Sequence, residues 1–462
     1  MTEKQQEQLT LVGIFILALI VRLLFIVVFG AAEQIYDSLH DQYIYIDLAK
    51  SILAGRGFSM SFDIFVADAY EPTAIQQPLY PLLLAVVFFL FGESYLAVRI
   101  LQAILSAGTC VIMYLIAKPT LGSTVSRLTA LILCIYPLSV MYIRPMMSET
   151  LYTFLLSLVV LSIAKVVPGA PRVIHIIVPG VLFGLMFLIR PEILILAPMM
   201  IVFVVTRLRQ QKQRSLRSIL AGCAIAGLAF GITISPWAVR NWYAFGEPLV
   251  VPSKRWGMWA ETWLRYMRDT SPGWAAACDN ELECAIPNFD QRSELERDRY
   301  TAELARSFIA MHPELLPRYA VSRFFRSYPI IPREELPPPL GYKGVKDRPQ
   351  DGYDPTSLDD VPLYVTGIEK VRVWSFRILL AGAVLGLTIA VRRRARDMLL
   401  PALLICFSAV TALLLAGTER YRLPTDPFLI LAAAYGFVSV AAYLRKLYVL
   451  RQADPGPMHK AS

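Results

Sequence analysis

Long apolar runs dominate the pattern of hydrophobic and polar positions along the chain. One of these runs, Leu79 to Phe91, is too short to cross a membrane, and Pro78 and Pro81 mark its start. We expect this short run to lie in, or dip into, the outer leaflet. Ten runs approach the roughly 20 residues that a spanning helix needs, and they fall at 9–30, 97–117, 122–143, 147–166, 173–189, 191–207, 218–236, 374–391, 398–416 and 425–444. The pattern predicts an all-α polytopic membrane protein with a bundle of about ten transmembrane helices, juxtamembrane helices in the first outer loop and a small extracytoplasmic region.

The composition agrees with this architecture and limits the classes of molecule that the protein is expected to bind. Of the 462 residues, 56% are hydrophobic and 18% are charged, with a mean hydropathy of +0.51. Soluble proteins are less apolar. The net charge of +9 does not indicate a nucleic-acid-binding protein, because the basic residues gather in short loops beside apolar runs. Membrane lipids are the expected surroundings.

Three basic clusters set the orientation. If each run crosses once, all three lie on one side of the membrane, which the positive-inside rule makes the cytoplasmic side. We therefore expect a multi-pass protein of the inner (plasma) membrane of a bacterium. The clusters are Arg207, Arg209, Lys212, Arg214 and Arg217; then Arg392, Arg393, Arg394 and Arg396; then Arg445, Lys446 and Arg451.

The runs divide the chain into three regions. Residues 1–236 form an N-terminal transmembrane module, which includes a first outer loop at 31–96. Residues 237–373 form an extracytoplasmic loop region, and residues 374–462 hold the C-terminal transmembrane helices.

Two cysteines stand apart from the other four. Cys278 and Cys284 flank a polar segment of the loop region, whereas the others lie within apolar runs as small hydrophobic side chains. An oxidising compartment favours a disulfide between the pair. Zinc is disfavoured, because two cysteines without nearby His or Cys partners supply too few ligands.

Two carboxylates lie at the outer ends of apolar segments. Asp41 is in the first outer loop, and Glu149 is near the start of a span. Span parity places both on the extracytoplasmic side, together with Arg240 and Arg420. A carboxylate at the edge of a bilayer is costly unless it is used. The alternative is that Asp41 caps a helix and that the negative charge of Glu149 interacts favourably with the N-terminus of its helix.

Arginines in the membrane or at its outer edge are the second signal. Each alone is expected to pair with a carboxylate or a carbonyl, but together they indicate an anion site, because arginine binds phosphate with two parallel hydrogen bonds. Arg420 and Arg422 cannot both point the same way on a helix, and we expect Arg420 to reach the anion. The set is Arg22, Arg99, Arg144, Arg190, Arg240, Arg420 and Arg422.

Several motifs, in this order along the chain, together resemble the GT-C glycosyltransferases, in the branch of protein O-mannosyltransferases and lipid A aminoarabinose transferases. The resemblance covers nearly the whole chain and is weaker over residues 250–370. It departs at Gln76 and Gln77, where some relatives carry a lysine or arginine, and at Gln42, where the family commonly has an acidic residue. The motifs are Asp41–Ser59, Gln77-Pro78-Leu79-Tyr80-Pro81, Ser148-Glu149, Leu188-Ile189-Arg190-Pro191, Pro236-Trp237-Ala238-Val239-Arg240-Asn241 and Glu419-Arg420-Tyr421-Arg422-Leu423-Pro424.

The resemblance implies a GT-C-like bundle and an enzyme, a hexosyl- or pentosyltransferase. A sugar would pass from a polyprenyl-phosphate donor to a glycan, lipid or protein acceptor on the extracytoplasmic face, with inversion of the anomeric centre. Such a transfer needs a base for the acceptor's proton and a cation for the departing phosphate. Asp41 is the expected base and Glu149 a second active-site carboxylate. Arg420 is the expected phosphate ligand, with Arg240 and Arg190 as the next candidates.

Aromatic residues and metals are less well defined by the sequence. Tyr43, Tyr45 and Trp237 are candidates for stacking on the sugar, although Tyr and Trp at an interface are typically membrane anchors. Gln42 disfavours a metal bridged by adjacent carboxylates. The pattern names no metal ligand and no certain cofactor, and it gives only weak support to a divalent metal.

Three other functions compete with sugar transfer. A transporter or flippase of lipid-linked saccharides would show paired repeats with broken helices, and a loop region of about 135 residues without a visible repeat argues against it. A polymerase of lipid-linked saccharides is closer in chemistry and is not separated by the sequence. A scaffold protein would leave the costly arginines unexplained.

Overall fold

The computed structural model of the chain describes residues 2–29, 40–61, 70–166, 173–210, 216–253, 267, 285–288, 291–330, 365–414 and 418–453. These residues are mostly helical, and the one β-type pairing among them joins Ser59 and Pro72. The predicted all-α architecture is confirmed.

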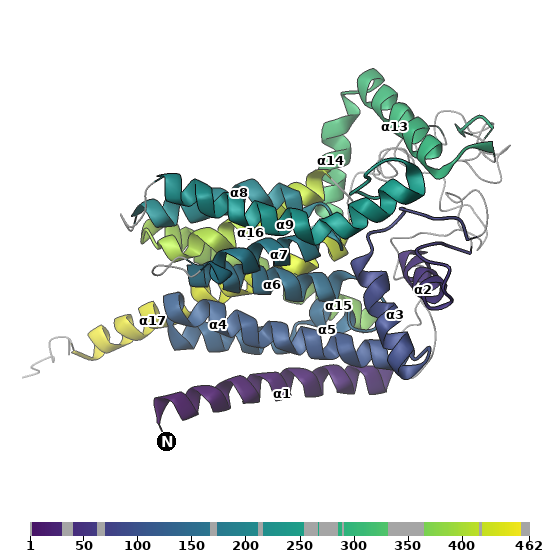
Figure 1. The fold of residues 1–462 in the computed structure, drawn as a ribbon. Helices are drawn as coiled ribbons and strands as arrows, with labels where there is room; N and C mark the ends of the chain where they lie inside the picture. Colours follow the sequence, from purple (N-terminus) through teal and green to yellow (C-terminus); the bar gives the residue numbers. More distant parts are fainter. Residues whose placement is uncertain are drawn as a thin grey trace, which may run out of the picture.

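The long helices run side by side along one axis and form a bundle, as Figure 1 shows. They are α1 (Glu3–Phe29), α4 (Tyr95–Ile135), α6 (Glu149–Val166), α7 (Ile174–Phe187), α8 (Ile193–Gln210), α9 (Leu216–Phe245), α15 (Val365–Arg392), α16 (Leu399–Leu414) and α17 (Asp426–Ala453). The shorter elements are α2 (His40–Leu53), α3 (Leu79–Phe91), α5 (Pro137–Met141), α13 (Glu294–Met311), α14 (Leu315–Ser327), η4 (Arg396–Met398), η5 (Glu419–Tyr421) and η6 (Leu423–Thr425).

The helices agree with a multi-pass membrane protein. Among the described residues, six helices are long and apolar enough to cross a membrane, and four apolar helices are shorter. The shorter four include α6, α7 and α8, which correspond to predicted spans, and α3, which corresponds to the run judged too short. The ten predicted runs therefore all coincide with helices, and α4 contains two of them.

α4 is a hairpin of two helices rather than one long rod. Gly122 has φ +82° and ψ 171°, which breaks the helix between the two predicted runs, and glycine adopts positive φ without steric cost. Cys110 and Cys134 lie equally far from Gly122 along the sequence, one on each arm. Arg22 of α1 contacts both, because its Nη2 donates to Cys110 Sγ at 3.7 Å and its Nη1 donates to the Cys134 carbonyl at 3.1 Å. The chain therefore reverses at Gly122.

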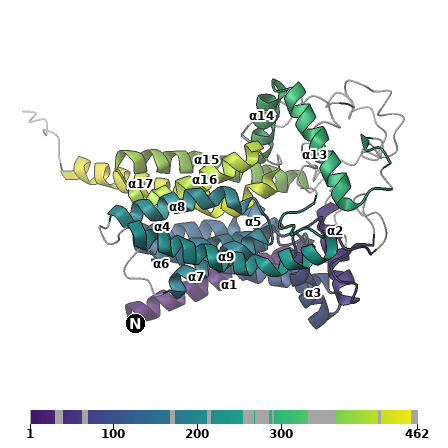
Figure 2. The ribbon, with the colours of Figure 1, turned by 45° about the horizontal axis from the view of Figure 1, so that its top comes forward.

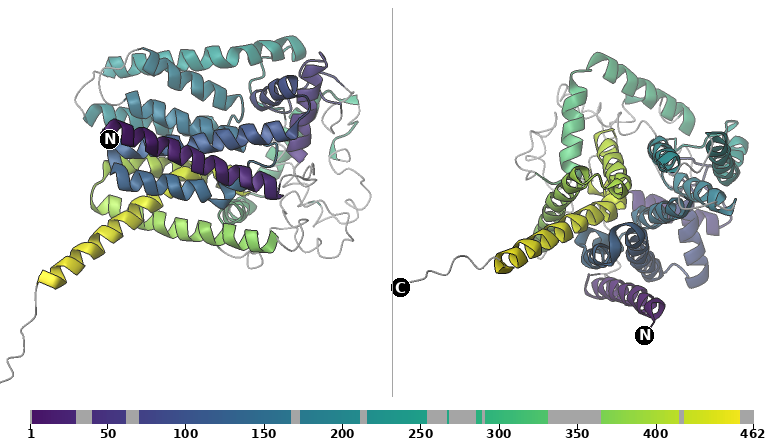
Figure 3. Two further views of the ribbon diagram at one scale, coloured as in Figure 1. Left: turned by 90° about the horizontal axis from the view of Figure 1, so that it is seen from below. Right: turned by 90° about the vertical axis from the view of Figure 1, so that its left-hand side faces the viewer.

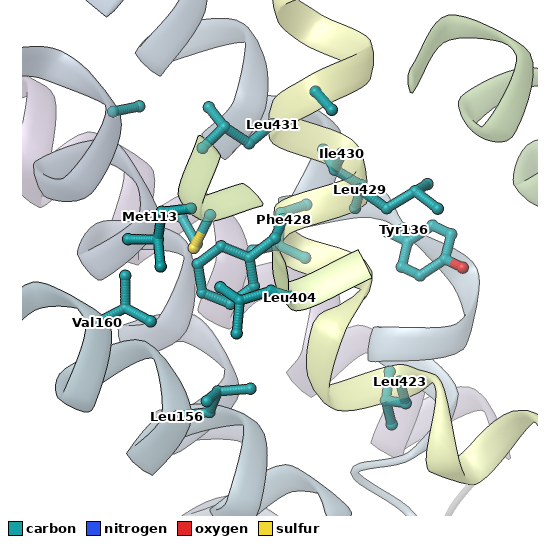
Figure 4. Close-up of a cluster of buried hydrophobic side chains, with 14 of the residues drawn as sticks. Met113, Tyr136, Leu156, Val160, Leu404, Leu423, Phe428, Leu429, Ile430 and Leu431 are labelled. Carbon is teal, nitrogen blue, oxygen red and sulfur yellow. The ribbon is translucent and has the colours of Figure 1, made fainter. Parts of the chain in front are cut away.

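Small residues let neighbouring helices approach closely. A Cβ added at Gly386 of α15 would collide with the Ala432 carbonyl of α17, and one at Gly180 of α7 would collide with the Ala226 carbonyl of α9. Close approach of this kind is typical of helices packed within a membrane. Figure 4 shows the apolar centre of the bundle, where Phe428 and Leu404 are buried against Met113.

The elements outside the bundle gather at one end. Figures 1 and 2 show α2, α3 and α13 at the end opposite the N-terminus, and Figure 3 shows α17 leading the chain out at the N-terminal end. α3 runs across the end of the bundle instead of along it (Figure 1). It buries Tyr80, Leu84 and Phe88 and leaves Phe89 77% exposed. This agrees with the prediction that the short run does not cross the membrane.

Candidate active site

Asp41 lies in the first turn of α2 and meets partners from two distant parts of the chain. Arg420 Nη2 is 2.6 Å from Asp41 Oδ2. Gln76, just before α3, donates from Nε2 to Asp41 Oδ1 at 3.3 Å. Ile44 and Leu48 are fully buried and fix the orientation of α2. Packing of this helix therefore turns the carboxylate toward the arginine.

Glu149 is the first residue of α6 and has no exposed surface. Its Oε1 accepts a hydrogen bond from Arg190 Nη2 at 2.5 Å and lies 3.7 Å from Arg420 Nε. Its other oxygen, Oε2, is buried without a hydrogen-bond partner. The carboxylate therefore lies between the N-terminus of α6 and two guanidinium groups. The unpartnered oxygen is able to accept a hydrogen bond from a ligand, since a buried acceptor without a partner is otherwise costly.

The two arginines flank one aromatic ring. The guanidinium carbons of Arg190 and Arg420 lie 5.0 Å and 5.2 Å from the centre of the Tyr421 ring. Arg190 Nε also donates to Ser148 Oγ at 3.3 Å. Two guanidinium groups and two carboxylates thus share one cluster, the site cluster of Asp41, Glu149, Arg190 and Arg420, and its formal charges balance.

The site cluster opens on one side. The side chains of Arg420 and Asp41 are 20% and 18% exposed, whereas those of Arg190 and Glu149 are 9% and 0% exposed. A ligand that approaches from the solvent would meet the Asp41–Arg420 pair first.

A second group of charges fixes the turn that carries Arg420. Glu419 pairs with Arg372 of α15. Arg422 Nη1 donates to Asp426 Oδ1 at 3.1 Å, and Arg422 Nε donates to the Ser327 carbonyl at 2.9 Å. These residues fix η5 on the side away from the site cluster. Arg420 and Arg422 therefore contact different partners.

Arg240, the other arginine proposed for the phosphate, is held by neutral oxygens. Its Nη1 donates to the Thr73 carbonyl at 2.8 Å and to Asn241 Oδ1 at 2.8 Å, and its Nη2 donates to the Phe58 carbonyl at 2.6 Å. These bonds join α9 to the first outer loop. No described contact connects Arg240 to the site cluster, and its role toward a phosphate stays a prediction.

The three aromatic candidates differ in exposure. Tyr45 is 4% exposed, packs edge-on against Tyr80 with ring centres 5.0 Å apart, and places its hydroxyl 3.5 Å from Ser148 Oγ. Trp237 is 7% exposed and packs edge-on against Phe58. Tyr43 is half-buried. Tyr45 is thus buried beside Ser148 and Trp237 is buried against Phe58, and stacking on a sugar stays a prediction for all three.

Two other sequence expectations concern cysteines and metals. Cys278 and Cys284 lie outside the described residues, so the predicted disulfide stays a prediction.

Within the described residues there is no group of three or more His, Cys, Asp or Glu side chains that could hold a metal ion. Asp41 and Glu149 are both engaged by arginines, and this set of donors does not fit a divalent cation.

The sequence did not indicate every residue of the site. Gln76 appeared only as a departure from the family pattern, yet it bonds Asp41. Tyr421 lies inside a quoted motif, but nothing in the local pattern shows that its ring separates two arginines. Its position directly after Arg420 is the one signal that could have found it.

Comparison with known proteins relates this geometry to a family. Residues 72–239, just over a third of the chain, match the family described as dolichyl-phosphate-mannose-protein mannosyltransferase. The matched segment contains Gln76, Glu149 and Arg190 and ends one residue before Arg240. A comparison with curated proteins finds no match.

Solved structures share the fold. AglB, the oligosaccharyltransferase of Archaeoglobus fulgidus, aligns in complex with an inhibitory peptide and a dolichol-phosphate (TM-score 0.54) and in its apo form (TM-score 0.55). Both alignments have 14% identity and cover 100% of this chain and 53% of the other, so the chain spans about half the length of these proteins. ArnT from Cupriavidus metallidurans bound to undecaprenyl phosphate aligns at 13% identity over 96% of this chain and 80% of the other, with a TM-score of 0.39. The shared fold and the long apolar helices show a multi-pass membrane protein with a GT-C-like fold, and residues 72–239 are similar to a mannosyltransferase family.

Proposed function

We propose that the protein transfers one sugar from a polyprenyl-phosphate-linked donor to an acceptor hydroxyl on the extracytoplasmic face of the membrane, with inversion. The observation that carries this proposal is the site cluster, in which two carboxylates and two arginines from four distant segments meet at one end of the bundle. The family match and the GT-C fold favour the same class of reaction.

In the proposed step a carboxylate accepts the proton of the acceptor and an arginine binds the departing phosphate. The acceptor oxygen attacks the anomeric carbon, and its proton passes to a carboxylate. The bond from the anomeric carbon to the phosphate oxygen breaks, and the electron pair stays on the phosphate. Attack on the face opposite the phosphate inverts the centre without a sugar–enzyme intermediate.

The open side of the site cluster suggests which residue takes each role. Asp41 suits the base, because its carboxylate is partly exposed while Glu149 is fully buried. Arg420 suits the phosphate, because its planar guanidinium offers several donors to an oxyanion and is the more exposed of the two arginines. Glu149 and Arg190 then complete the charge balance behind them.

The position of the basic residues supports an extracytoplasmic site. α15 ends at Arg392, and the last turns of α17 carry Arg445 and Lys446, at the end of the bundle that also holds the N-terminus (Figure 1). The site cluster lies at the opposite end. By the positive-inside rule, this arrangement supports a cytoplasmic position for the basic end and an outer position for the site.

The decisive experiment supplies the purified protein with a panel of polyprenyl-phosphate sugars and measures the release of polyprenyl phosphate. We expect release with at least one sugar when an acceptor fraction from the cell envelope is present. A transporter would move labelled lipid across proteoliposomes without cleaving it. Transport without cleavage for the whole panel would reject the enzyme.

A separate measurement tests the side of the membrane. A single cysteine at exposed Arg56, in the segment that follows α2, should react with an impermeant thiol reagent in intact cells. A cysteine at exposed Arg393, beyond the end of α15, should react only after lysis. The reverse pattern would place the site in the cytoplasm.

A further inference from the structure

We propose that Asp41 and the donor phosphate compete for Arg420, so that binding of the donor itself releases the base, while Gln76 holds the released carboxylate in place. This inference rests on the proposed function and adds an order of events to it. Asp41 acquires a second role as an internal competitor of the substrate's phosphate.

The geometry places the competing group on the phosphate ligand itself. Arg420 Nη2 is 2.6 Å from Asp41 Oδ2, which is the distance of a charge-assisted hydrogen bond. The same guanidinium reaches Glu149 Oε1 at 3.7 Å through Nε and lies beside the Tyr421 ring. If a phosphate took Nη2, the other two contacts would still anchor the arginine.

Charge balance favours an exchange of partners. The two arginines of the site cluster already face two carboxylates, so an arriving phosphate finds no unpaired cation among them. We therefore expect the phosphate to replace a carboxylate at one of the guanidinium groups.

Burial decides which arginine makes the exchange. Separating Arg190 from Glu149 would leave a carboxylate with no exposed surface without its closest counter-ion, and breaking a buried pair in this way is strongly destabilising. The pair of Arg420 and Asp41 is about one-fifth exposed, and water can solvate the released group, so the cost is smaller. Arg420 is therefore the arginine that changes partner.

The exchange also turns Asp41 into a better base. A carboxylate beside a guanidinium is a poor proton acceptor, because the positive charge favours the ionised form. Loss of Arg420 to the phosphate removes that effect. Gln76 Nε2 still donates to Oδ1 at 3.3 Å and, as a neutral amide, it orients Asp41 without restoring the positive charge. A lysine or arginine at position 76 would supply that charge permanently.

The first test measures the affinity of the purified full-length protein for undecaprenyl phosphate in nanodiscs. Arg420→Ala should weaken binding. Asp41→Asn, which removes the competitor and keeps the shape, should tighten binding about tenfold, since apparent affinity rises as the competent fraction rises. Asp41→Glu keeps a competing carboxylate and should bind more like the wild type than Asp41→Asn does.

The double variant Asp41→Asn/Arg420→Ala separates competition from general electrostatics. If Asp41 acts through Arg420, its removal changes nothing once Arg420 is absent. A gain of affinity that persists in the Arg420→Ala background would mean that the Asp41 charge simply repels the ligand, and this would overturn the exchange. An Asp41→Asn protein with unchanged affinity would overturn it as well.

Gln76 is tested by kinetics. Gln76→Met should lower kcat several-fold without raising KM for the donor, because the carboxylate loses its positioning partner after the phosphate has bound. An increase in KM alone would assign Gln76 to donor binding and overturn its positioning role. Failure of the proposed function has a different signature: the wild type would cleave no donor. Failure of the exchange leaves cleavage intact and abolishes only the effects of Asp41→Asn on affinity.

Discussion

Two groups of charges lie on either side of the η5 turn, and they differ in how far their side chains are exposed to solvent. The site cluster opens toward solvent at Asp41 and Arg420. The group behind it, which we call the frame cluster, consists of Arg372, Glu419, Arg422 and Asp426, whose side chains are all 6% exposed or less. Both groups contain two arginines and two carboxylates.

An arginine next to a carboxylate has different surroundings in the two clusters. In the frame cluster Arg422 also bonds a backbone carbonyl and lies over the Phe376 ring at 3.7 Å, so it joins α14, α15 and α17. In the site cluster, the side chains of Asp41 and Arg420 keep about one-fifth of their surface exposed. The frame cluster is suited to hold a turn, and the site cluster is suited to bind a ligand.

The largest expected effect is on turnover. Asp41→Asn cannot accept a proton, and turnover should fall by about 10²–10⁴-fold in the release assay. Asp47→Asn is the matched control on the same helix, because Asp47 bonds only Ser61 N and Oγ among its described partners, and we expect turnover close to that of the wild type. Near-normal turnover of Asp41→Asn would move the base role to Glu149.

The frame cluster should respond in stability. Arg422→Met leaves Asp426 buried without its counter-ion, which should cost about 3–5 kcal/mol of unfolding free energy. The double variant Arg422→Met/Asp426→Leu should recover much of that loss, because no unpaired charge is left. Arg420→Met is the control from the site cluster and should lose less stability, since its pair is partly exposed. Thermal unfolding in detergent measures all three, and equal losses for Arg420→Met and Arg422→Met would erase the proposed difference between the clusters.

The phosphate ligand should show its dependence on geometry. Arg420→Lys keeps the positive charge but loses the fork of donors, so kcat/KM for the donor should fall by roughly 10²-fold. Arg420→Ala should fall at least as far. Arg377→Lys is the control, because Arg377 donates to the Pro329 carbonyl away from the site. Full activity of Arg420→Lys would show that charge alone suffices.

The smallest expected effect is a pH dependence of the folding stability, and it comes from a carboxyl group on α13, outside the bundle. Glu294 of α13 accepts a hydrogen bond from Ala74 N at 2.9 Å, and burial raises the pKa of its carboxyl above the ordinary value. A raised pKa in the folded state gives stability that is present at low pH and is lost as the pH rises through that pKa. Glu294→Gln keeps the acceptor oxygen and removes the titration. The wild type should therefore lose stability relative to this variant between acidic and neutral pH, and a constant difference in unfolding temperature would contradict this.

The apolar runs alone predicted where the bundle helices lie and at which ends of them charges gather. Membrane spans are recognisable because about 20 apolar residues in a row have few alternatives in water. The short run at Leu79–Phe91 was separable by length alone. Asp41, Glu149 and Arg420 stood out because charges at a bilayer edge are costly, and the structure brings these three together.

Only the tertiary structure decided which charges meet. Asp41 and Arg420 are 379 residues apart, and no local pattern links them, because their contact depends on how α2 packs and on how the frame cluster holds η5. The same holds for Arg240, which was expected beside Arg190 at a phosphate but bonds backbone carbonyls instead of a carboxylate. Local sequence sets helix length and the cost of a charge. Partners are set by packing between helices, which depends on every segment at once.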